Sequence, residues 1–307
     1  MSVERPFSRP KNDGDKPRRA NPRKSPSLLM YKLALARASR EGDGRAPVES
    51  DNPFTVYNPP QATDDVAAAW AALRTVALDP GLLDRNLVIT ANRSDPAHIS
   101  FDVLRAKIVQ PLAERGWKRV GITSPSRGCG KSFVAANLAI SLSRYKAFRT
   151  ILMDMDLRLP TVARTLGLTD LSSMGEFLRG HVGVGDFIRR VGPNPLNIGP
   201  SLALGLNGRG EPFAAELFHE SVTAASLARL DAALAPDIML FDLPPVLAVD
   251  DVIAIKPHVD CLLVVAAAGL TTPRELREMS LRLGDDTPIL GVVLNKGEGE
   301  DLSGYGV

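Results

Sequence analysis

The sequence predicts an α/β fold in which a mostly parallel sheet carries helices on both faces. Two observations lead to this prediction. From about residue 88 onward, short runs that are apolar throughout alternate with longer stretches of helical periodicity, which is the pattern of parallel strands buried between helices. The chain is also long enough, at 307 residues with 44% hydrophobic side chains, to bury the core that such a sheet requires.

The expected elements follow one another in a regular order. Residues 64–78 begin with two aspartates and place Ala, Leu and Trp at helical spacing, so we expect a helix packed on the domain, which residues 79–86 then break. Further helices are expected at 100–116, 132–144, 220–234 and 273–283. Strands are expected at 119–123, 150–156, 196–199, 238–244, 261–268 and 288–295. Ligands of such sheets bind at the carboxyl ends of the strands.

The chain divides into four regions by composition. Residues 1–60 are rich in Arg, Lys and Pro without apolar periodicity, which predicts a disordered basic arm. Within the arm, residues 27–40 could form a short basic amphipathic helix that contacts anionic lipid or a partner, or the arm could be solvated without a specific role. Residues 61–87 are expected to form a helical linker, residues 88–296 the α/β domain and residues 297–307 a flexible tail.

Composition and charge favour a cytoplasmic protein. Cys129 and Cys261 lie far apart and outside any metal-binding spacing, which is typical of a reducing compartment. The longest apolar run, which starts at Cys261, is far shorter than the roughly 20 residues that cross a bilayer, and the N-terminus lacks the apolar core of a signal peptide. With a formal net charge of +2 and few aromatic residues among the basic residues of the arm, the chain is not expected to bind nucleic acid.

The stretch SPSRGCGKS at 124–132 predicts a loop that holds phosphates. It follows an expected strand and opens an expected helix, as a phosphate-binding P-loop must. Gly128 and Gly130 can turn backbone N–H groups inward, Lys131 can reach the terminal phosphates, and the Ser132 hydroxyl can ligate magnesium. The strict pattern has glycine where Pro125 stands. The residues expected to contact a nucleotide are Ser126, Arg127, Gly128, Cys129, Gly130, Lys131, Ser132 and Phe133.

Acidic residues end two further apolar strands. Asp242 ends the run that starts at residue 238, where a carboxylate could hold magnesium through water. Asp154 and Asp156 end the run that starts at residue 150, and Arg158 follows two residues later. Together with the loop, these strand ends predict a P-loop NTPase fold that binds ATP and Mg²⁺.

Four segments carry a family resemblance. SPSRGCGKSFVAANLA, ILMDMDLRLP, FDLPPVLAVDD and ILGVVLN, in this order and spacing, resemble the bacterial tyrosine kinases of the capsule and exopolysaccharide system over residues 94–295. The resemblance implies transfer of the γ-phosphoryl group of ATP to tyrosine, in the chain itself or in polysaccharide-pathway enzymes. It also implies a separate membrane-spanning activator of the chain-length-determinant type, and a cytoplasmic location peripheral to the inner membrane.

The resemblance also implies roles for single residues. Lys131 would neutralise the phosphates, Ser132 and Asp156 would hold the metal with support from Asp242, and Asp154 would polarise the attacking hydroxyl. Arg158 could hold a phosphate or pair with a carboxylate. Asn295 could read the base or form a turn, and the Cys129 thiol could be reactive or simply small.

Two departures from the family concern phosphorylation and assembly. Such kinases end in a cluster of tyrosines, whereas this chain carries Tyr305 alone as its expected phosphoacceptor in the tail. The family's E-x-x-R-x-x-R pattern for ring assembly falls on Ile99, Asp102 and Arg105, so only the last residue matches and a homo-oligomer of that kind is left open.

Two alternative functions stay open at this point. A dimerising ATPase of the plasmid-partition or division-site type would carry a signature lysine early in the loop, where this chain has Ser126 followed by Arg127. An ATP-gated regulator of polysaccharide assembly without kinase activity would use the same nucleotide site, because phosphoryl transfer and hydrolysis need the same charges.

Overall fold

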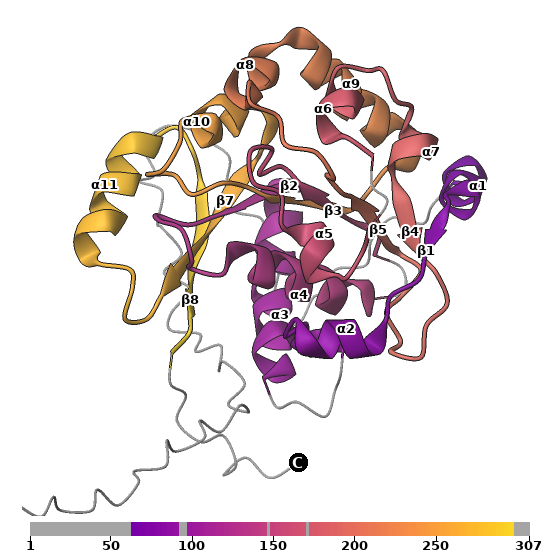
Figure 1. The fold of residues 1–307 in the computed structure, drawn as a ribbon, viewed down its shortest axis with the longest axis horizontal. Helices are drawn as coiled ribbons and strands as arrows, with labels where there is room; N and C mark the ends of the chain where they lie inside the picture. The colour runs from indigo at the N-terminus through magenta and orange to yellow at the C-terminus, as the bar shows by residue number, and fades with distance from the viewer. Residues whose placement is uncertain (1–62, 92–96, 146–147, 170–171, 298–307) are drawn as a thin grey trace, which may run out of the picture.

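The computed structural model describes residues 63–91, 97–145, 148–169 and 172–297, which form one eight-stranded sheet with helices on both faces (Figure 1). The expected fold class is therefore confirmed. The strands are β1 (Thr75–Val76), β2 (Arg119–Thr123), β3 (Thr150–Asp154), β4 (Arg189–Val191), β5 (Leu202–Gly205), β6 (Ile238–Asp242), β7 (Cys261–Ala267) and β8 (Ile289–Asn295).

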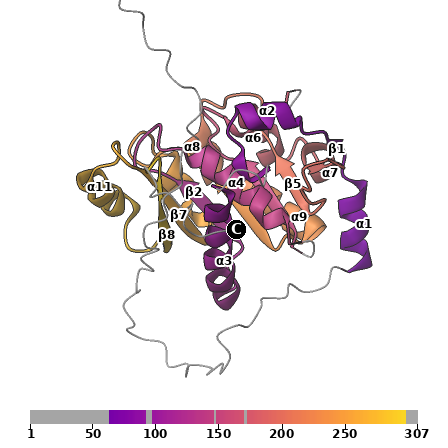
Figure 2. The ribbon, with the colours of Figure 1, turned by 90° about the horizontal axis from the view of Figure 1, so that it is seen from below.

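The strands lie in the order β1-β4-β5-β3-β6-β2-β7-β8. All neighbouring strands are parallel except β4 and β5, which are antiparallel. β1 and β8 form the two edges, with α1 beside the first and α11 beside the second (Figure 2). The central strands β3, β6 and β2 are thus covered on both sides, and their carboxyl ends point to one edge of the molecule.

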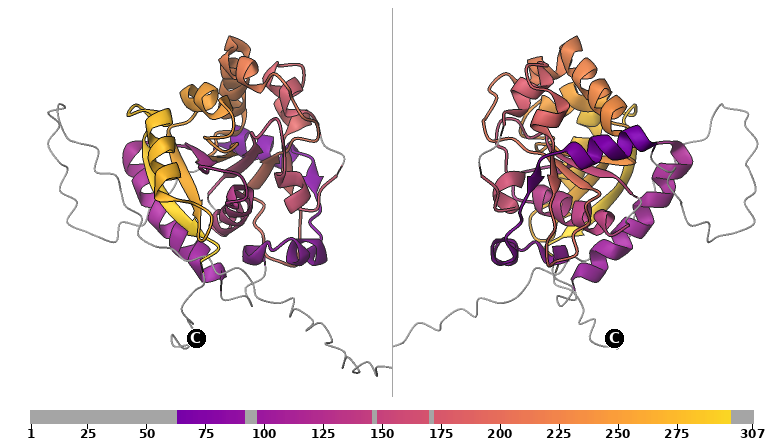
Figure 3. Two further views of the ribbon diagram at one scale, coloured as in Figure 1. Left: turned by 60° about the vertical axis from the view of Figure 1, so that its left-hand side comes forward. Right: turned by 90° about the vertical axis from the view of Figure 1, so that its right-hand side faces the viewer.

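The helices divide between the two faces of the sheet, as the turned views show (Figure 3). One face carries α2 (Pro80–Arg85), η1 (Ile89–Ala91), α3 (His98–Arg115), α4 (Lys131–Ser143) and α5 (Val162–Thr165). The other carries α1 (Asp64–Ala72), α6 (Met174–Leu178), α7 (Val184–Phe187), α8 (Ala214–His219), α9 (Ser221–Leu234), α10 (Asp251–Ile255) and α11 (Pro273–Leu283), with η2 (Lys256–His258) after α10.

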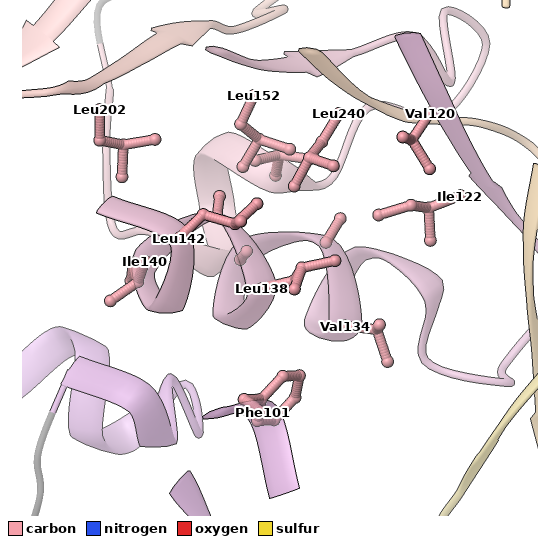
Figure 4. Packing of buried hydrophobic residues seen from close by; sticks show 14 of the residues in the cluster. Phe101, Val120, Ile122, Val134, Leu138, Ile140, Leu142, Leu152, Leu202 and Leu240 are labelled. Atoms are coloured by element: carbon pink, nitrogen blue, oxygen red, sulfur yellow. The ribbon is translucent and has the colours of Figure 1, made fainter. Parts of the chain in front are cut away.

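Because successive side chains of a strand point to opposite faces of the sheet, each face has its own hydrophobic core. In β3, Leu152 points to the α4 face while Ile151 and Met153 point to the α9 face. Figure 4 shows α4 on the first face, with Leu138 and other apolar side chains of the helix directed at the strands. Helix α4 packs between the sheet and α3, which explains why ten consecutive residues from Val134 are buried and why its mostly apolar sequence still forms a stable helix.

Four of the expected helices and five of the expected strands are confirmed. The helices are α3, α4, α9 and α11, and the strands are β2, β3, β6, β7 and β8. Helix α3 ends at Gly116, which adopts a left-handed φ of 66°. Helix α11 begins with a capping box between Thr272 and Glu275 and has Pro273 in its first turn.

The expected first helix and its break differ from the structure. The helix ends at Ala72, and Thr75–Val76 instead joins the sheet as β1, paired with β4. Residues 79–86, expected only as a break, contain α2, because Asp79 accepts hydrogen bonds from the backbone N–H groups of Gly81 and Leu82 and Pro80 occupies the first turn.

The prediction of a strand at 196–199 is wrong. This apolar stretch is an irregular loop, because the Asn194 side chain accepts hydrogen bonds from the N–H groups of Leu196 and Ile198 and Asn197 takes a positive φ of 54°. The strand begins at Leu202, as β5, six residues after the expected start. The apolar run therefore reflects burial of Ile198 rather than pairing in the sheet.

The N-terminal arm (1–60), its amphipathic segment (27–40) and Tyr305 lie outside the described residues. Among the described residues, no helix combines the length and the apolar character needed to cross a bilayer.

Trp70 holds α1 to the domain. Its side chain is 6% exposed, and its indole Nε1–H donates to the backbone oxygen of Leu234 at 2.7 Å. We expect Trp70→Ala to reduce the free energy of unfolding by about 3 kcal/mol, because a buried aromatic side chain is removed. Trp70→Phe keeps most of the apolar contact and loses the hydrogen bond, so a loss of about 1 kcal/mol is expected. Urea denaturation measures both, and equal losses would contradict the assignment of the main effect to packing.

Candidate nucleotide-binding site

The site lies where β2, β3 and β6 end. Because these strands are parallel neighbours, their last residues meet at one edge of the sheet, and Asp154 of β3 is the register partner of Asp242 of β6. The loop 124–130 follows β2 at the same edge. The backbone after β6 lies against this loop, since the N–H groups of Val246 and Leu247 donate to the oxygens of Ser124 and Pro125.

The loop turns through two glycines. Gly128 and Gly130 have φ angles of 81° and 92°, which side chains other than glycine rarely adopt. Gly130 is the N-cap of α4, so the helix begins directly at Lys131. The N–H groups of the first helical turn therefore lie at the end of α4 that carries Lys131, and such a helix N-terminus favours anions.

Asn295, at the end of β8, holds the glycine loop by a hydrogen bond to its backbone. Its side chain is 2% exposed, and its Nδ2 donates to the backbone oxygen of Cys129 at 2.8 Å. The Cys129 side chain is also buried, with its sulfur 3.4 Å from the Thr271 hydroxyl. Asn295 thus binds the backbone of the loop, which favours a supporting role over base reading, and the Cys129 thiol is shielded from solvent.

Lys131 contacts the carboxylate of Asp156. Its Nζ lies 3.0 Å from Asp156 Oδ2, and both side chains are largely buried. The other Asp156 oxygen accepts the N–H of Leu159 at 3.2 Å. In this state the lysine charge is balanced by an aspartate, from which a phosphate could displace it.

Ser132 lies between Asp242 and a residue that no sequence motif predicted. Its hydroxyl donates to Asp242 Oδ2 at 2.5 Å and lies 2.6 Å from the Thr161 hydroxyl. The backbone N–H groups of Thr161 and Val162 donate to Asp154 Oδ2 at 3.0 and 2.9 Å. The segment that enters α5 therefore links the carboxylate of β3 to the serine of the loop.

The charges in this cluster alter one another's proton affinity. Burial opposes the charge of Lys131, but attraction by Asp242 and Asp156 outweighs it, so the pKa of Lys131 is raised. Burial, together with the charge of Asp242, raises the pKa of Asp154 well above its usual range. Burial raises the pKa of Asp242 to about 6, against the opposing effects of Lys131 and the Ser132 hydroxyl. The site thus holds more negative charge than Lys131 can compensate.

Arg158 forms an ion pair with Asp251. Its Nε and Nη2 bind the two oxygens of Asp251 at 2.8 and 2.9 Å, and its Nη1 donates to the oxygen of Pro212. The hydrogen bond to Asp251 raises the pKa of Arg158. Of the two options left open for Arg158, the structure shows the carboxylate pair, with the arginine still at the rim of the cleft.

A cleft of about 170 Å³ opens beside the loop. Lys131, Asp156 and Thr161 face it, and the exposed Arg127 stands at its mouth. The rest of its lining is Gly128, Arg158, Leu159, Pro244, Pro245 and Val249. A larger groove of about 950 Å³, lined by residues 193–200 and the end of α4, lies at the far end of that helix and carries none of the site's carboxylates.

Ser126 and Phe133 lie apart from the charged cluster. The Ser126 hydroxyl is 3.8 Å from the Cys129 sulfur, and Phe133 packs edge-on against Phe101 with ring centroids 5.8 Å apart. Neither side chain reaches the cleft, so only their backbone groups are placed to contact a nucleotide.

The residues missed by sequence reasoning are Thr161 and Asp251. Thr161 is joined to the site only by folding, because it lies 29 residues from Ser132. Asp251 lies 93 residues from Arg158, and its place in the acidic pair at 250–251 is the one local signal that could have drawn attention to it.

The side chains present fit a magnesium ion. Asp154 Oδ1 and Asp242 Oδ1 are buried without hydrogen-bond partners among the described residues, and the Ser132 hydroxyl contacts the other oxygen of Asp242 and the Thr161 hydroxyl. Carboxylate and hydroxyl oxygens are the ligands that Mg²⁺ takes, usually one or two from the protein with phosphate and water for the rest.

We expect Gly130→Ala to abolish nucleotide binding while leaving the fold intact. A Cβ at this position would lie 2.1 Å from Asn295 Nδ2, and φ would stay in the strained range. Titration with a fluorescent nucleotide should show at least about 100-fold weaker binding, given strain and clash of several kcal/mol.

Gly128→Ala is the matched control for this change. It has the same kind of φ, but its nearest new contact is Leu270 at 3.7 Å, so about 10-fold weaker binding is expected from strain alone. Combining Gly130→Ala with Asn295→Ala should reduce the loss of nucleotide binding toward that of Gly128→Ala, because the clash with the Asn295 side chain is removed. No difference between the two single variants would contradict the contact with Asn295.

The glycine loop that opens α4, the mostly parallel sheet and the carboxylates at neighbouring strand ends together define a P-loop NTPase fold. Within this class, the chain is a relative of the bacterial tyrosine-protein kinases, so the resemblance seen in the sequence is confirmed. No protein-family model matches the chain.

Two relatives illustrate the likeness in sequence. The chain is 27% identical over 235 residues to the tyrosine-protein kinase YwqD of Bacillus subtilis, an alignment that covers 73% of this chain and 91% of that protein. It is 28% identical over 211 residues to the tyrosine-protein kinase wzc of Salmonella typhi, which covers 68% of this chain but 28% of that protein. The chain therefore spans most of the first relative and about a quarter of the second.

Solved structures show the same likeness in fold. The kinase domain of VpsO matches with a TM-score of 0.55 and 27% identity, over 64% of this chain and 95% of that one. The kinase domain of the Escherichia coli tyrosine kinase ETK matches with a TM-score of 0.59 and 24% identity, over 69% of this chain and 80% of that one.

Proposed function

We propose that this chain transfers the γ-phosphoryl group of Mg²⁺-ATP to tyrosine hydroxyls, in copies of itself or in proteins that make capsule or exopolysaccharide. The observation that carries the proposal is the cluster in which Lys131 contacts Asp156 and Ser132 contacts Asp242 at the glycine loop, in a chain related to tyrosine-protein kinases.

Phosphoryl transfer suits this cluster because the reaction needs mainly positioning and charge neutralisation. In the proposed reaction, Lys131 exchanges Asp156 for the phosphates, and loop N–H groups hold the phosphate oxygens. Ser132 and Asp156 would hold the magnesium ion with support from Asp242. When bound, the metal would neutralise charge that develops on the phosphate oxygens.

The proposed role of Asp154 concerns the acceptor hydroxyl. One of its oxygens is fixed by two backbone N–H groups, and the other is buried without a partner among the described residues. A fixed carboxylate with a free oxygen could orient the acceptor hydroxyl toward the phosphate. Thr161 and the Arg158–Asp251 pair act as positioning residues in this proposal, since they hold the segment that follows Asp156.

The proposed setting is the cytoplasmic side of a membrane, with a separate membrane-spanning activator of the chain-length-determinant type. Support comes from the relatives, one of which, in Klebsiella pneumoniae, is described as a putative tyrosine-protein kinase in a cps region. The basic arm is a candidate for contact with the membrane or with the activator.

Self-assembly through α3 would differ from the pattern that the resemblance implies. Asp102 and Arg105 are paired with each other at 2.8 Å, and Arg105 also donates to the backbone oxygen of Ser141. Both charges are thus used within one copy. A homo-oligomer, if formed, would need other contacts on this helix.

The test is incubation of the full-length protein with Mg²⁺ and γ-labelled ATP, followed by mapping of phosphotyrosine by mass spectrometry. We expect label on tyrosine, including Tyr305 of the tail, and none in Lys131→Met. ATP hydrolysis without phosphotyrosine, also after addition of native membranes, would refute the kinase and leave an ATP-gated regulator.

A further inference from the structure

We propose that Tyr145 is a phosphoacceptor of this chain, modified by a second copy rather than by its own active site. The inference rests on the proposed kinase function. It concerns a tyrosine within the folded domain, at the opposite end of α4 from the phosphate-binding loop.

Tyr145 lies at the surface, and no described residue binds its hydroxyl. The chain has four tyrosines, and Tyr145 is the one that falls in the part of the chain that the structure describes. Its side chain is 44% exposed. No described residue makes a hydrogen bond to its phenol oxygen, so the hydroxyl can act as a nucleophile without first losing a partner.

Two neighbouring side chains hold the ring of Tyr145 in place. The Arg105 guanidinium lies over the ring at 4.5 Å from its centroid, and Phe148 meets the ring edge-on at 6.4 Å. These contacts fix the ring, which lowers the entropy lost when the hydroxyl enters another active site. Tyr145 follows the last turn of α4, with its N–H bonded to the oxygen of Leu142, so the side chain projects from the end of a rigid helix.

Arg105 also places a cation beside the product. A phosphotyrosine would carry a charge of about −1.5 to −2 near this guanidinium, which is a favourable partner for phosphate oxygens. At present the guanidinium contacts Asp102 and Ser141 through Nη1, while its Nε is buried without a partner among the described residues. Phosphate would compete with Asp102 for the arginine, at the contact between α3 and α4.

The position of Tyr145 excludes transfer within one copy. Helix α4 starts at Lys131 in the site and runs for 13 residues, so its two ends are about 20 Å apart. A tyrosine side chain cannot cross that distance. The active site that modifies Tyr145 must therefore belong to a second copy of the chain.

The reaction balances with ATP as the sole co-substrate. The Tyr145 oxygen forms a bond to the γ-phosphorus, the bond from that phosphorus to the oxygen it shares with the β-phosphate breaks, and ADP leaves with the electron pair. The phenolic proton passes to water, because a loose transition state needs little help from a base.

The test separates donor from acceptor. A full-length Lys131→Met chain, which should not transfer phosphate, serves as acceptor, and a full-length Tyr145→Phe chain serves as donor, distinguished by a mass tag. After incubation with Mg²⁺-ATP, the acceptor is mapped by mass spectrometry. We expect phosphotyrosine at Tyr145 of the acceptor only when donor is present, and at least a fivefold lower yield when the acceptor also carries Tyr145→Phe.

Each other outcome has a defined meaning. Phosphotyrosine at Tyr31, Tyr57 or Tyr305 with Tyr145 unmodified would overturn the inference and leave the kinase function standing. Modification of Tyr145 in wild-type protein at a rate per molecule that does not change on dilution would overturn transfer between copies. ATP hydrolysis without any phosphotyrosine would overturn both proposals.

Discussion

Lys131→Met is expected to lower the rate of phosphoryl transfer at least about 1,000-fold while the chain stays folded. Among the described residues, Lys131 is the cation in direct contact with the carboxylates of the site, and removal of a single preorganised charge from such a site costs about this much. Single-turnover transfer of label from ATP measures the rate, and circular dichroism checks the fold.

The stability of this variant should also depend on pH. Asp154 and Asp242 would stay buried without the lysine, whose charge lowers the pKa of both, so their carboxylates would be more easily protonated. We expect the variant to lose more stability relative to wild type at pH 8 than at pH 5.

Lys256→Met is the matched control for the lysine. Lys256 is also largely buried and paired, with Nζ 2.7 Å from Asp286, but it lies after α10 and outside the site. Its loss should leave phosphoryl transfer within about twofold of wild type. A similar loss of transfer in both variants would contradict a specific role for Lys131.

Asp242→Asn is expected to make the nucleotide-free protein more stable at neutral pH and to abolish magnesium-dependent activity. The pKa of Asp242 is about 6 in the folded chain, above the usual value for an aspartate, because burial disfavours its charge. The carboxyl therefore favours the folded state while it is protonated, and this contribution is lost as pH rises through about 6. An asparagine at this position carries no charge and can still accept the hydrogen bond of Ser132.

The stability gain of Asp242→Asn should thus grow between about pH 4 and 6 and then stay constant at about 1–3 kcal/mol. Thermal unfolding of wild type and variant across this range measures it. A gain that does not vary with pH would contradict a raised pKa at Asp242.

Asp251→Asn is the matched control, with the opposite expected sign. The Asp251 side chain is 1% exposed and pairs with Arg158 through both oxygens, so its charge is compensated. Loss of one partner of such a pair costs about 3–5 kcal/mol when the pair is buried, and somewhat less here because Arg158 is partly exposed. The same substitution should therefore destabilise the protein at this position.

Local patterns in the sequence determined the main strands of this protein, one of its helices and the place of its nucleotide site. The apolar runs that became β2, β6 and β7 could be recognised because strands buried on both faces exclude polar residues, and α11 because its cap and periodicity are local. The loop at 124–132 and the aspartates 154, 156 and 242 could be placed together because parallel strands end at one edge, whatever their order in the sheet.

Tertiary structure alone decided which partner each of these groups found. The sequence identified Arg158 and Ser132 as candidate site residues. It did not identify their partners Asp251 and Thr161, because each pair forms between segments far apart in the chain. It marked Asn295 as a residue after a strand, yet its support of the loop depends on β8 lying beside β7 at the sheet's edge. The loop at 196–199 was mistaken for a strand because burial produces the same apolar pattern with or without backbone pairing. Periodicity reports burial, whereas contacts between distant segments depend on the packing of the whole chain.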